Sequence, residues 1–192
     1  MKRIPSVLAL TLVAAASLVL ISCAKQTPGP QPMTEAEQIA RGSYLTHTSG
    51  CNDCHTPGYF YGAPDTTRLL SGSELGWKGP WGVSYARNLT PEPQTGIGAW
   101  SESDIVTAIR TGKRPDGRML LPPMPWPDFA HFTDDDAMAI AKFLKSIPPV
   151  SHKVPDILPP DGTVTGSAFV LPPPPAWDAP RTPPAGQAPA TP

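Results

Sequence analysis

The feature that most constrains this chain of 192 residues is the run Cys51-Asn52-Asp53-Cys54-His55. The spacing C-x-x-C-H is the attachment signature of c-type haem. Each thiol can add to one vinyl group of a porphyrin, and the histidine that follows the second thiol can bind the iron from the proximal side. The motif therefore predicts one covalently attached haem held by Cys51, Cys54 and His55, with His55 as an iron ligand.

Two other kinds of site share the C-x-x-C spacing, a thioredoxin-like redox pair and half of a zinc site. A redox pair belongs to an alternation of strands and helices, and the sequence shows no such alternation. A zinc site needs further cysteine or histidine ligands at close spacing. The remaining cysteine of the chain, Cys23, lies outside the segment that would fold around the motif. Covalent haem is the favoured interpretation.

Three segments have the capping residues and apolar spacing of helices. The expected helices run from about residue 35 to 47, from Ser101 to Gly112, and from Thr133 to Pro148. Thr34 with Glu37 and Ser101 with Asp104 have the spacing of capping boxes. Gly42 lies inside the first helix, where a glycine is unfavourable unless another helix approaches closely.

Residues 56–99 show little periodicity and contain many glycines and prolines. A loop of this length is unusual in a compact domain, but it is reasonable if it wraps a large prosthetic group. The expected fold class is therefore all-α, with three main helices and long loops around one covalent haem, and with no convincing sheet.

The N-terminus has the pattern of an export signal. Lys2 and Arg3 precede an apolar run over residues 4–21, and no acidic side chain occurs before residue 35. The run ends in Leu20-Ile21-Ser22-Cys23, which resembles the lipobox of bacterial lipoproteins. We expect a signal peptide over residues 1–22, lipidation of Cys23, and a proline-containing linker that completes residues 23–34. The alternative is an uncleaved membrane helix, because the 18 residues of this run are just long enough to span a bilayer.

The C-terminus is dominated by proline. Residues 148–192 contain 14 of the chain's 28 prolines, so this segment buries too little to fold alone. The haem domain is therefore expected over residues 35–150, and residues 151–192 are expected to be an extended or disordered tail whose apolar stretch 163–171 can lie on the domain as a strap. With 15 basic and 16 acidic side chains the chain has no basic excess, which argues against a nucleic-acid partner.

The sixth ligand of the iron has to come from outside the motif. The candidates are Met119, Met124, Met138, His47 and His131. Met124 has the strongest case, because prolines at positions 122, 123, 125 and 127 stiffen its segment and leave little entropy to lose when the weak thioether bond forms. Met119 is the alternative. Core packing better explains Met138. His47 lies too near Cys51 to reach the opposite face of the haem. His131 precedes the third helix and is expected to be an exposed neighbour of the helix cap.

Several motifs together resemble class I cytochrome c of the bacterial monohaem type, related to haem domains of membrane dehydrogenase cytochrome subunits. They are Arg41-Gly42-x-Tyr44-Leu45, Cys51 to Thr56, Asn88-Leu89-Thr90-Pro91, Thr95-Gly96-Ile97-Gly98-x-Trp100, Pro115-Asp116-Gly117-Arg118 and Met124-Pro125. The resemblance implies that Met124 ligates iron opposite His55, and that the first helix packs across the last. Dehydrogenase subunits typically hold several haem domains, whereas this chain has one motif.

An iron with histidine and methionine ligands has no open position, so it exchanges single electrons, and methionine raises its reduction potential. We therefore expect an electron carrier rather than an enzyme. Its partners would be redox proteins, including a membrane dehydrogenase or terminal oxidase, and a lipid on Cys23 would tether it on the periplasmic side of the inner or outer membrane. The alternatives are a haem subunit inside a dehydrogenase or oxidase complex, and a peroxidase or ligand sensor with a labile sixth position. The residues expected to line the haem pocket are Tyr44, Trp77, Trp81, Trp100, Leu120 and Phe129, each of which fits an ordinary core position equally well.

Overall fold

The computed structural model describes residues 31–172. The expected signal peptide, the anchor residue Cys23 and the tail from residue 173 onward lie outside the described residues. The chain separates into an N-terminal unit, Met1–Met33, and a unit from Thr34 onward, and every helix and strand described below lies in the second. Within residues 31–172, no helix has the length and apolar character needed to cross a membrane.

The three predicted helices are confirmed. The helices of the described part are α2 (Glu35–Thr48), α3 (Cys51–His55), α4 (Glu102–Thr111), α5 (Trp126–Phe129) and α6 (Asp134–Ser146), and two 3-10 turns, η1 (Tyr59–Tyr61) and η2 (Thr66–Arg68), follow α3. The capping boxes before α2 and α4 both form, and Thr133 caps α6 by accepting a hydrogen bond from the backbone of Asp136. Gly112 ends α4 with φ of 70°, the left-handed conformation that glycine adopts readily.

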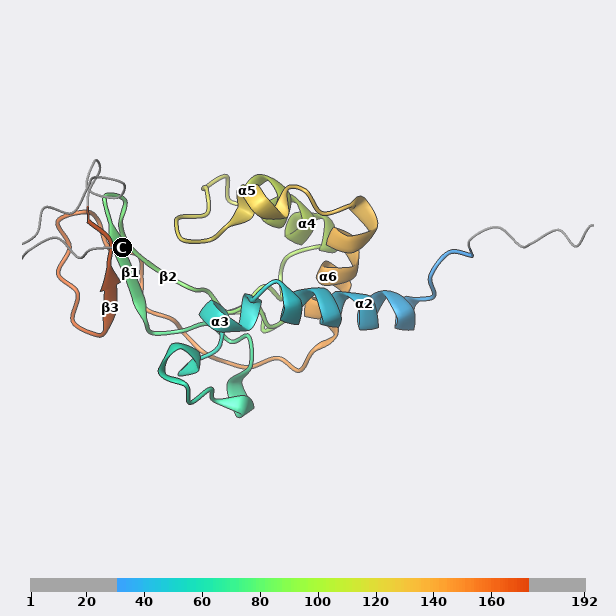
Figure 1. Cartoon of the computed structure of the whole chain (residues 1–192), viewed down its shortest axis with the longest axis horizontal. Coiled ribbons are helices and arrows are strands. Elements are labelled where there is room, and N and C mark those ends of the chain that lie inside the picture. Colours follow the sequence, from blue (N-terminus) through green and yellow to red (C-terminus); the bar gives the residue numbers. More distant parts are fainter. Residues whose placement is uncertain (1–30, 173–192) are drawn as a thin grey trace, which may run out of the picture. The chain divides into compact units, whose positions relative to one another are not determined.

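Helices α2 and α6 cross at Gly42, and Figure 1 shows α2 passing in front of α6. A Cβ atom on Gly42 would lie 1.9 Å from the carbonyl oxygen of Ala139 and 2.8 Å from the Cβ of Phe143. The helix approach that the sequence predicts at this glycine is therefore confirmed. Around the crossing, the buried core consists of Leu45, Leu70, Ile97, Ile105, Ile140, Ala141 and Leu144.

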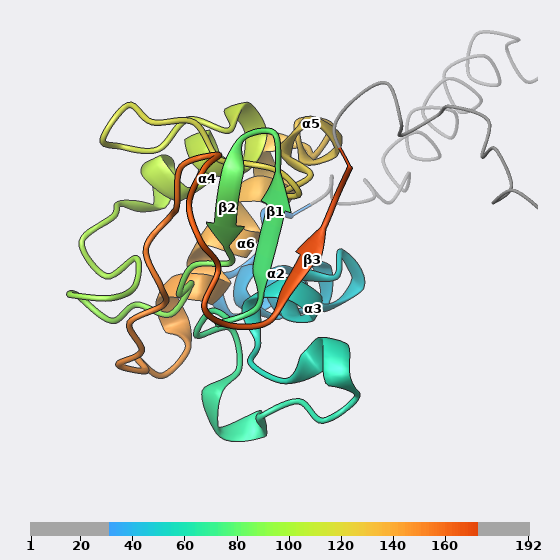
Figure 2. The same cartoon turned by 90° about the vertical axis from the view of Figure 1, so that its left-hand side faces the viewer.

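The expectation of an all-α fold is confirmed only in part, because a small sheet accompanies the helices. Strands β1 (Gly76–Gly79) and β2 (Gly82–Tyr85) form an antiparallel hairpin, and β3 (Ala168–Val170) pairs with β1 in parallel, with Trp77 opposite Phe169. Figure 2 shows β1 between the other two strands. The hairpin is rich in glycine and lacks a clear apolar alternation, and its third strand lies about 90 residues further along the chain. Local sequence patterns therefore do not reveal the sheet.

The described part of the C-terminal segment is extended and is docked on the domain. Val154 is 3 % exposed and packs with Val83 and Tyr85 of β2. Val83 also exchanges two backbone hydrogen bonds with Leu158, at 2.9 and 3.1 Å. In Figure 1 this segment returns from α6 toward the sheet. Residues beyond α6 thus contribute to the same folded unit as the helices.

Replacement of Gly42 by alanine should destabilise the fold. Alanine favours a helix over glycine by about 1 kcal/mol. The new methyl group would, however, overlap the Ala139 carbonyl, and overpacking of this kind costs about 1–3 kcal/mol. We expect a net loss in the free energy of unfolding, measured by urea denaturation. Gly166→Ala is the control, because its Cβ would meet nothing within 4 Å. Equal stability of both variants would contradict the close helix contact.

Candidate functional site

Helix α3 carries the two cysteines of the motif on one face, since residues three apart on a helix are neighbours. Both thiols are free and half-buried. Burial raises the pKa of Cys51 to about 11, and burial also raises the pKa of Cys54. Both groups therefore stay protonated at neutral pH. Disulfide exchange, which uses the thiolate, is therefore disfavoured at both positions.

His55 lies at the end of α3 with its ring buried. Its Nδ1 is 2.6 Å from the backbone carbonyl oxygen of Arg87. A carbonyl only accepts, so Nδ1 donates its hydrogen and the lone pair of a neutral ring remains on Nε2. Burial lowers the pKa of His55, while the bond to Arg87 opposes that shift. A neutral imidazole whose Nδ1–H is held by a carbonyl is the usual form of a histidine metal ligand.

The chain that follows His55 is fixed by buried hydrogen bonds. The Thr56 hydroxyl donates to the side-chain oxygen of Asn52 at 2.9 Å and accepts from the backbone N–H of Leu70 at 3.0 Å. The N–H of Gly72 donates to the His55 carbonyl at 2.8 Å. These contacts join α3 to residues 70–72 and hold the backbone around His55.

Met124 lies on the segment that leads into α5 and is half-buried, whereas Met119 is 49 % exposed. The Ser84 hydroxyl donates to the Pro122 carbonyl at 2.5 Å, which ties this segment to β2. Arg87, three residues after Ser84, holds His55. One short stretch of chain, residues 84–87, therefore contacts both the segment of Met124 and the imidazole of His55.

The other candidate ligands are engaged elsewhere or exposed. His47 is exposed, its Nδ1 donates to the Ser43 carbonyl at 2.7 Å, and its ring lies beside Phe143. His131 is exposed before α6, and Met138 is half-buried within α6. Among residues 31–172, no group of three or more His, Cys, Asp and Glu side chains is arranged to hold a metal ion.

The side chains expected to line the haem pocket lie in different parts of the structure. Tyr44 is 59 % exposed, with Arg41 stacked over its ring. Trp77 instead forms an aromatic cluster with Phe60 and Phe169, at centroid distances of 5.4 and 5.0 Å. Trp100 packs against the helical core, and Leu120 and Phe129 are half-buried. The indole N–H of Trp81 is buried without a partner among the described residues.

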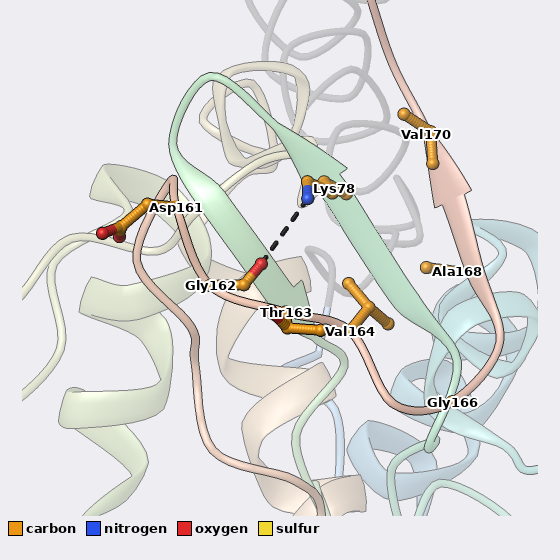
Figure 3. A pocket seen from close by; sticks show the side chains of 8 residues that line it. All are labelled: Lys78, Asp161, Gly162, Thr163, Val164, Gly166, Ala168 and Val170. Carbon is orange, nitrogen blue, oxygen red and sulfur yellow. Dashed lines mark hydrogen bonds between the residues drawn. The ribbon is translucent and has the colours of Figure 1, made fainter.

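A hollow of about 450 Å³ lies on the sheet rather than at the motif. Figure 3 shows it between β1, β3 and residues 161–166, with the amino group of Lys78 directed at the Gly162 carbonyl, 3.5 Å away. Neither α3 nor the segment of Met124 lines it. This hollow is therefore separate from the candidate haem site.

Sequence reasoning did not identify Arg87 as a residue of the site. Its contribution to His55 is a backbone carbonyl, which every residue type possesses, so its side chain gives no signal of this role. The neighbouring run Asn88-Leu89-Thr90-Pro91 was the closest available indication. The residues that are present fit a c-type haem: two protonated thiols on one helical face precede a buried, neutral histidine whose Nε2 makes no hydrogen bond to any described residue.

Thr56→Val should destabilise the backbone around His55. Valine has a similar shape but no hydroxyl, so the Leu70 N–H and the Asn52 side chain would lose a buried partner. Such losses cost about 1–3 kcal/mol. Denaturant titration should show this decrease in the free energy of unfolding, whereas Thr56→Ser, which keeps the hydroxyl, should retain most of the stability. A larger loss in Thr56→Ser than in Thr56→Val would show that packing of the methyl group matters instead of the hydrogen bonds.

Comparisons with known proteins agree with this site. No family model matches the chain. It is 40 % identical over 122 residues, 62 % of its own length, to the cytochrome c subunit of the quinone alcohol dehydrogenase of Gluconobacter oxydans, of which it covers 24 %. It is 35 % identical over 119 residues to the fructose dehydrogenase cytochrome subunit of Gluconobacter japonicus, covering 60 % of this chain and 23 % of that one.

A diheme cytochrome c-type protein of Cereibacter sphaeroides is 32 % identical over 116 residues, 58 % of this chain and 37 % of that protein. The chain thus spans about a quarter of the length of the dehydrogenase subunits that it matches. The matched part of this chain is homologous to cytochrome c subunits of dehydrogenases, which confirms the resemblance that the sequence motifs predict.

Proposed function

We propose that this protein is an electron-transfer c-type cytochrome with one haem, attached through Cys51 and Cys54 and ligated by His55 and Met124. The observation that carries this proposal is the hydrogen bond from His55 Nδ1 to the Arg87 carbonyl, which leaves Nε2 for the iron within a C-x-x-C-H motif. The haem would supply one-electron exchange between ferric and ferrous iron. The similarity to cytochrome c subunits supports the same cofactor.

The protein's own residues would hold this group in place and limit its chemistry. Thioether bonds to Cys51 and Cys54 would fix its position against α3. His55 and the Met124 sulfur would both ligate the iron, which would leave no site for a substrate. Methionine ligation also favours a higher reduction potential. These roles suit an electron carrier, with catalysis performed by a partner protein.

The proposed partner is a dehydrogenase. Several of the similar proteins are cytochrome subunits of alcohol and fructose dehydrogenases. The described haem motif would act as an electron-accepting unit that passes electrons onward to a second redox protein. Lipidation of Cys23 would keep it at the membrane on the periplasmic side, where such electrons are exchanged.

Removal of the motif thiols tests covalent attachment. Cys51→Ala and Cys54→Ala should each leave one thioether, and pyridine haemochrome spectra should shift to longer wavelength because one vinyl group stays unsaturated. The double variant should carry no haem after denaturing electrophoresis, as detected by haem stain. Cys23→Ala is the matched control and should keep the stain. An unstained parent protein would overturn the proposed function.

Replacement of Met124 tests the sixth ligand. Met124→Ala should abolish the weak far-red absorption of methionine-ligated ferric haem, lower the reduction potential, and allow carbon monoxide to bind the ferrous protein, because a coordination position opens. Optical spectra and potentiometric titration measure these changes. Met119→Ala is the control and should resemble the parent. If the far-red band is lost in Met119→Ala and kept in Met124→Ala, the sixth ligand is Met119.

A further inference from the structure

The segment that follows α6 runs along the chain that holds His55. The Asn88 side-chain amide donates to the Val150 carbonyl at 2.8 Å, and the Val150 N–H donates to the Thr90 hydroxyl at 3.1 Å. Asn88 and Thr90 are almost fully buried. Four residues later, Val154 is buried against β2. Residues 150–158 therefore lie directly on the stretch that includes residue 87.

Arg87 connects this segment to the imidazole through two different groups. Its backbone carbonyl accepts the hydrogen of His55 Nδ1 at 2.6 Å. Its guanidinium donates through Nη1 to the carbonyls of Pro155, at 2.9 Å, and Val154, at 3.4 Å. Hydrogen bonds that involve a charged group contribute more than neutral ones. The position of the acceptor carbonyl is thus coupled to residues 154 and 155.

His152 makes a second connection between the C-terminal segment and His55, through the backbone of Ser71 and Gly72. Its side chain is 10 % exposed, with Nδ1 at 2.9 Å from the Ser71 carbonyl and Nε2 at 2.8 Å from a carboxylate oxygen of Glu74. Gly72, next to Ser71, donates to the His55 carbonyl at 2.8 Å. Arg68 faces the same group, 3.5 Å from both Glu74 and the His152 ring.

We propose that residues 150–158 act as a brace for the proximal ligand His55, with Arg87 and His152 as its two positioning residues. The inference rests on the proposed function, because it concerns the histidine that would ligate iron. A partner that fixes Nδ1–H orients the ring and raises its basicity as a ligand. The brace holds that partner in place from outside the motif, and so the C-terminal segment tunes the haem site.

Arg87→Gln tests the brace by removing the charged donor while the backbone carbonyl of residue 87 remains. A weaker hydrogen bond from His55 Nδ1 to the residue 87 carbonyl makes the imidazole a weaker donor to ferric iron, so the reduction potential should rise. If the only effect of Arg87→Gln were the loss of a positive charge, the reduction potential would fall instead, because removal of a positive charge favours the ferric state. Exchange of the His55 Nδ1 proton with solvent, followed by NMR, should accelerate about tenfold if one charged hydrogen bond is lost. Arg87→Lys, which retains the charge and one donor group, should lie between Arg87→Gln and the parent.

Arg118→Gln is the control for charge, since Arg118 pairs with Asp116 on an exposed turn and makes no hydrogen bond to residues 150–158. It should leave the exchange of the Nδ1 proton unchanged. If Arg87→Gln and Arg118→Gln give the same exchange rate and potential, the brace is excluded. Haem stain and pyridine haemochrome are measured on every protein first. An unstained parent overturns the proposed function and the brace together, whereas stained variants that behave like the parent overturn the brace alone.

A double-mutant cycle shows whether the two positioning residues act through one segment. His152→Ala should change the potential in the same direction as Arg87→Gln. Release of either anchor already frees the segment, so the double variant should change the potential by less than the sum of the single variants. Additive shifts would mean two independent effects and would contradict a shared brace. If Arg87→Gln does not fold, Arg87→Lys takes its place in the cycle.

Discussion

His55 Nδ1 lies 2.6 Å from the carbonyl oxygen of Arg87, and the arrangement of the candidate site depends on this hydrogen bond. A neutral imidazole has one N–H and one lone pair, so use of the N–H at Nδ1 leaves Nε2 for a metal. Burial, which lowers the pKa of His55, keeps the ring neutral. The place of residue 87 in the fold therefore sets the orientation of the ring, and with it the direction in which Nε2 points.

Contacts from distant parts of the sequence hold residue 87. Upstream, β2 pairs with β1, and Ser84 reaches the segment of Met124. Downstream, the residues after Arg87 bond to Val150. The long stretch between α3 and α4 has few apolar residues at regular spacing, and it is ordered by these connections to the hairpin and to the C-terminal segment. The helices provide the core, while the extended segments position residue 87 and, through it, the His55 imidazole.

The matched segment of this chain corresponds to about a quarter of the longer cytochrome subunits of alcohol and fructose dehydrogenases. Three features of this chain were recognisable in its sequence: one C-x-x-C-H motif, a glycine that lets two helices cross, and a short methionine-containing segment. The proline-rich continuation of the chain adds β3 and the contacts to Arg87.

The local features of this protein follow from short stretches of its amino-acid sequence. The caps at Thr34 and Ser101, the end of α4 at Gly112 and the close helix approach at Gly42 could be predicted because each depends on residues a few positions apart, or on the absence of a side chain. The chemistry of the C-x-x-C-H motif could also be predicted, because thiols and an imidazole are distinctive groups. Placement of Met124 opposite His55 stays a prediction, because it came from proline spacing and from resemblance to a family.

Three long-range features depend on the folded chain instead: β3 joins a hairpin about 90 residues earlier, residues 150–158 pack on β2, and the Arg87 carbonyl binds His55. Strand pairing over such a separation depends on where the helices return the chain, and a short glycine-rich strand carries no periodic signal. A backbone carbonyl is the same in every residue. Its role becomes visible only when the fold brings an imidazole N–H within hydrogen-bond distance of it.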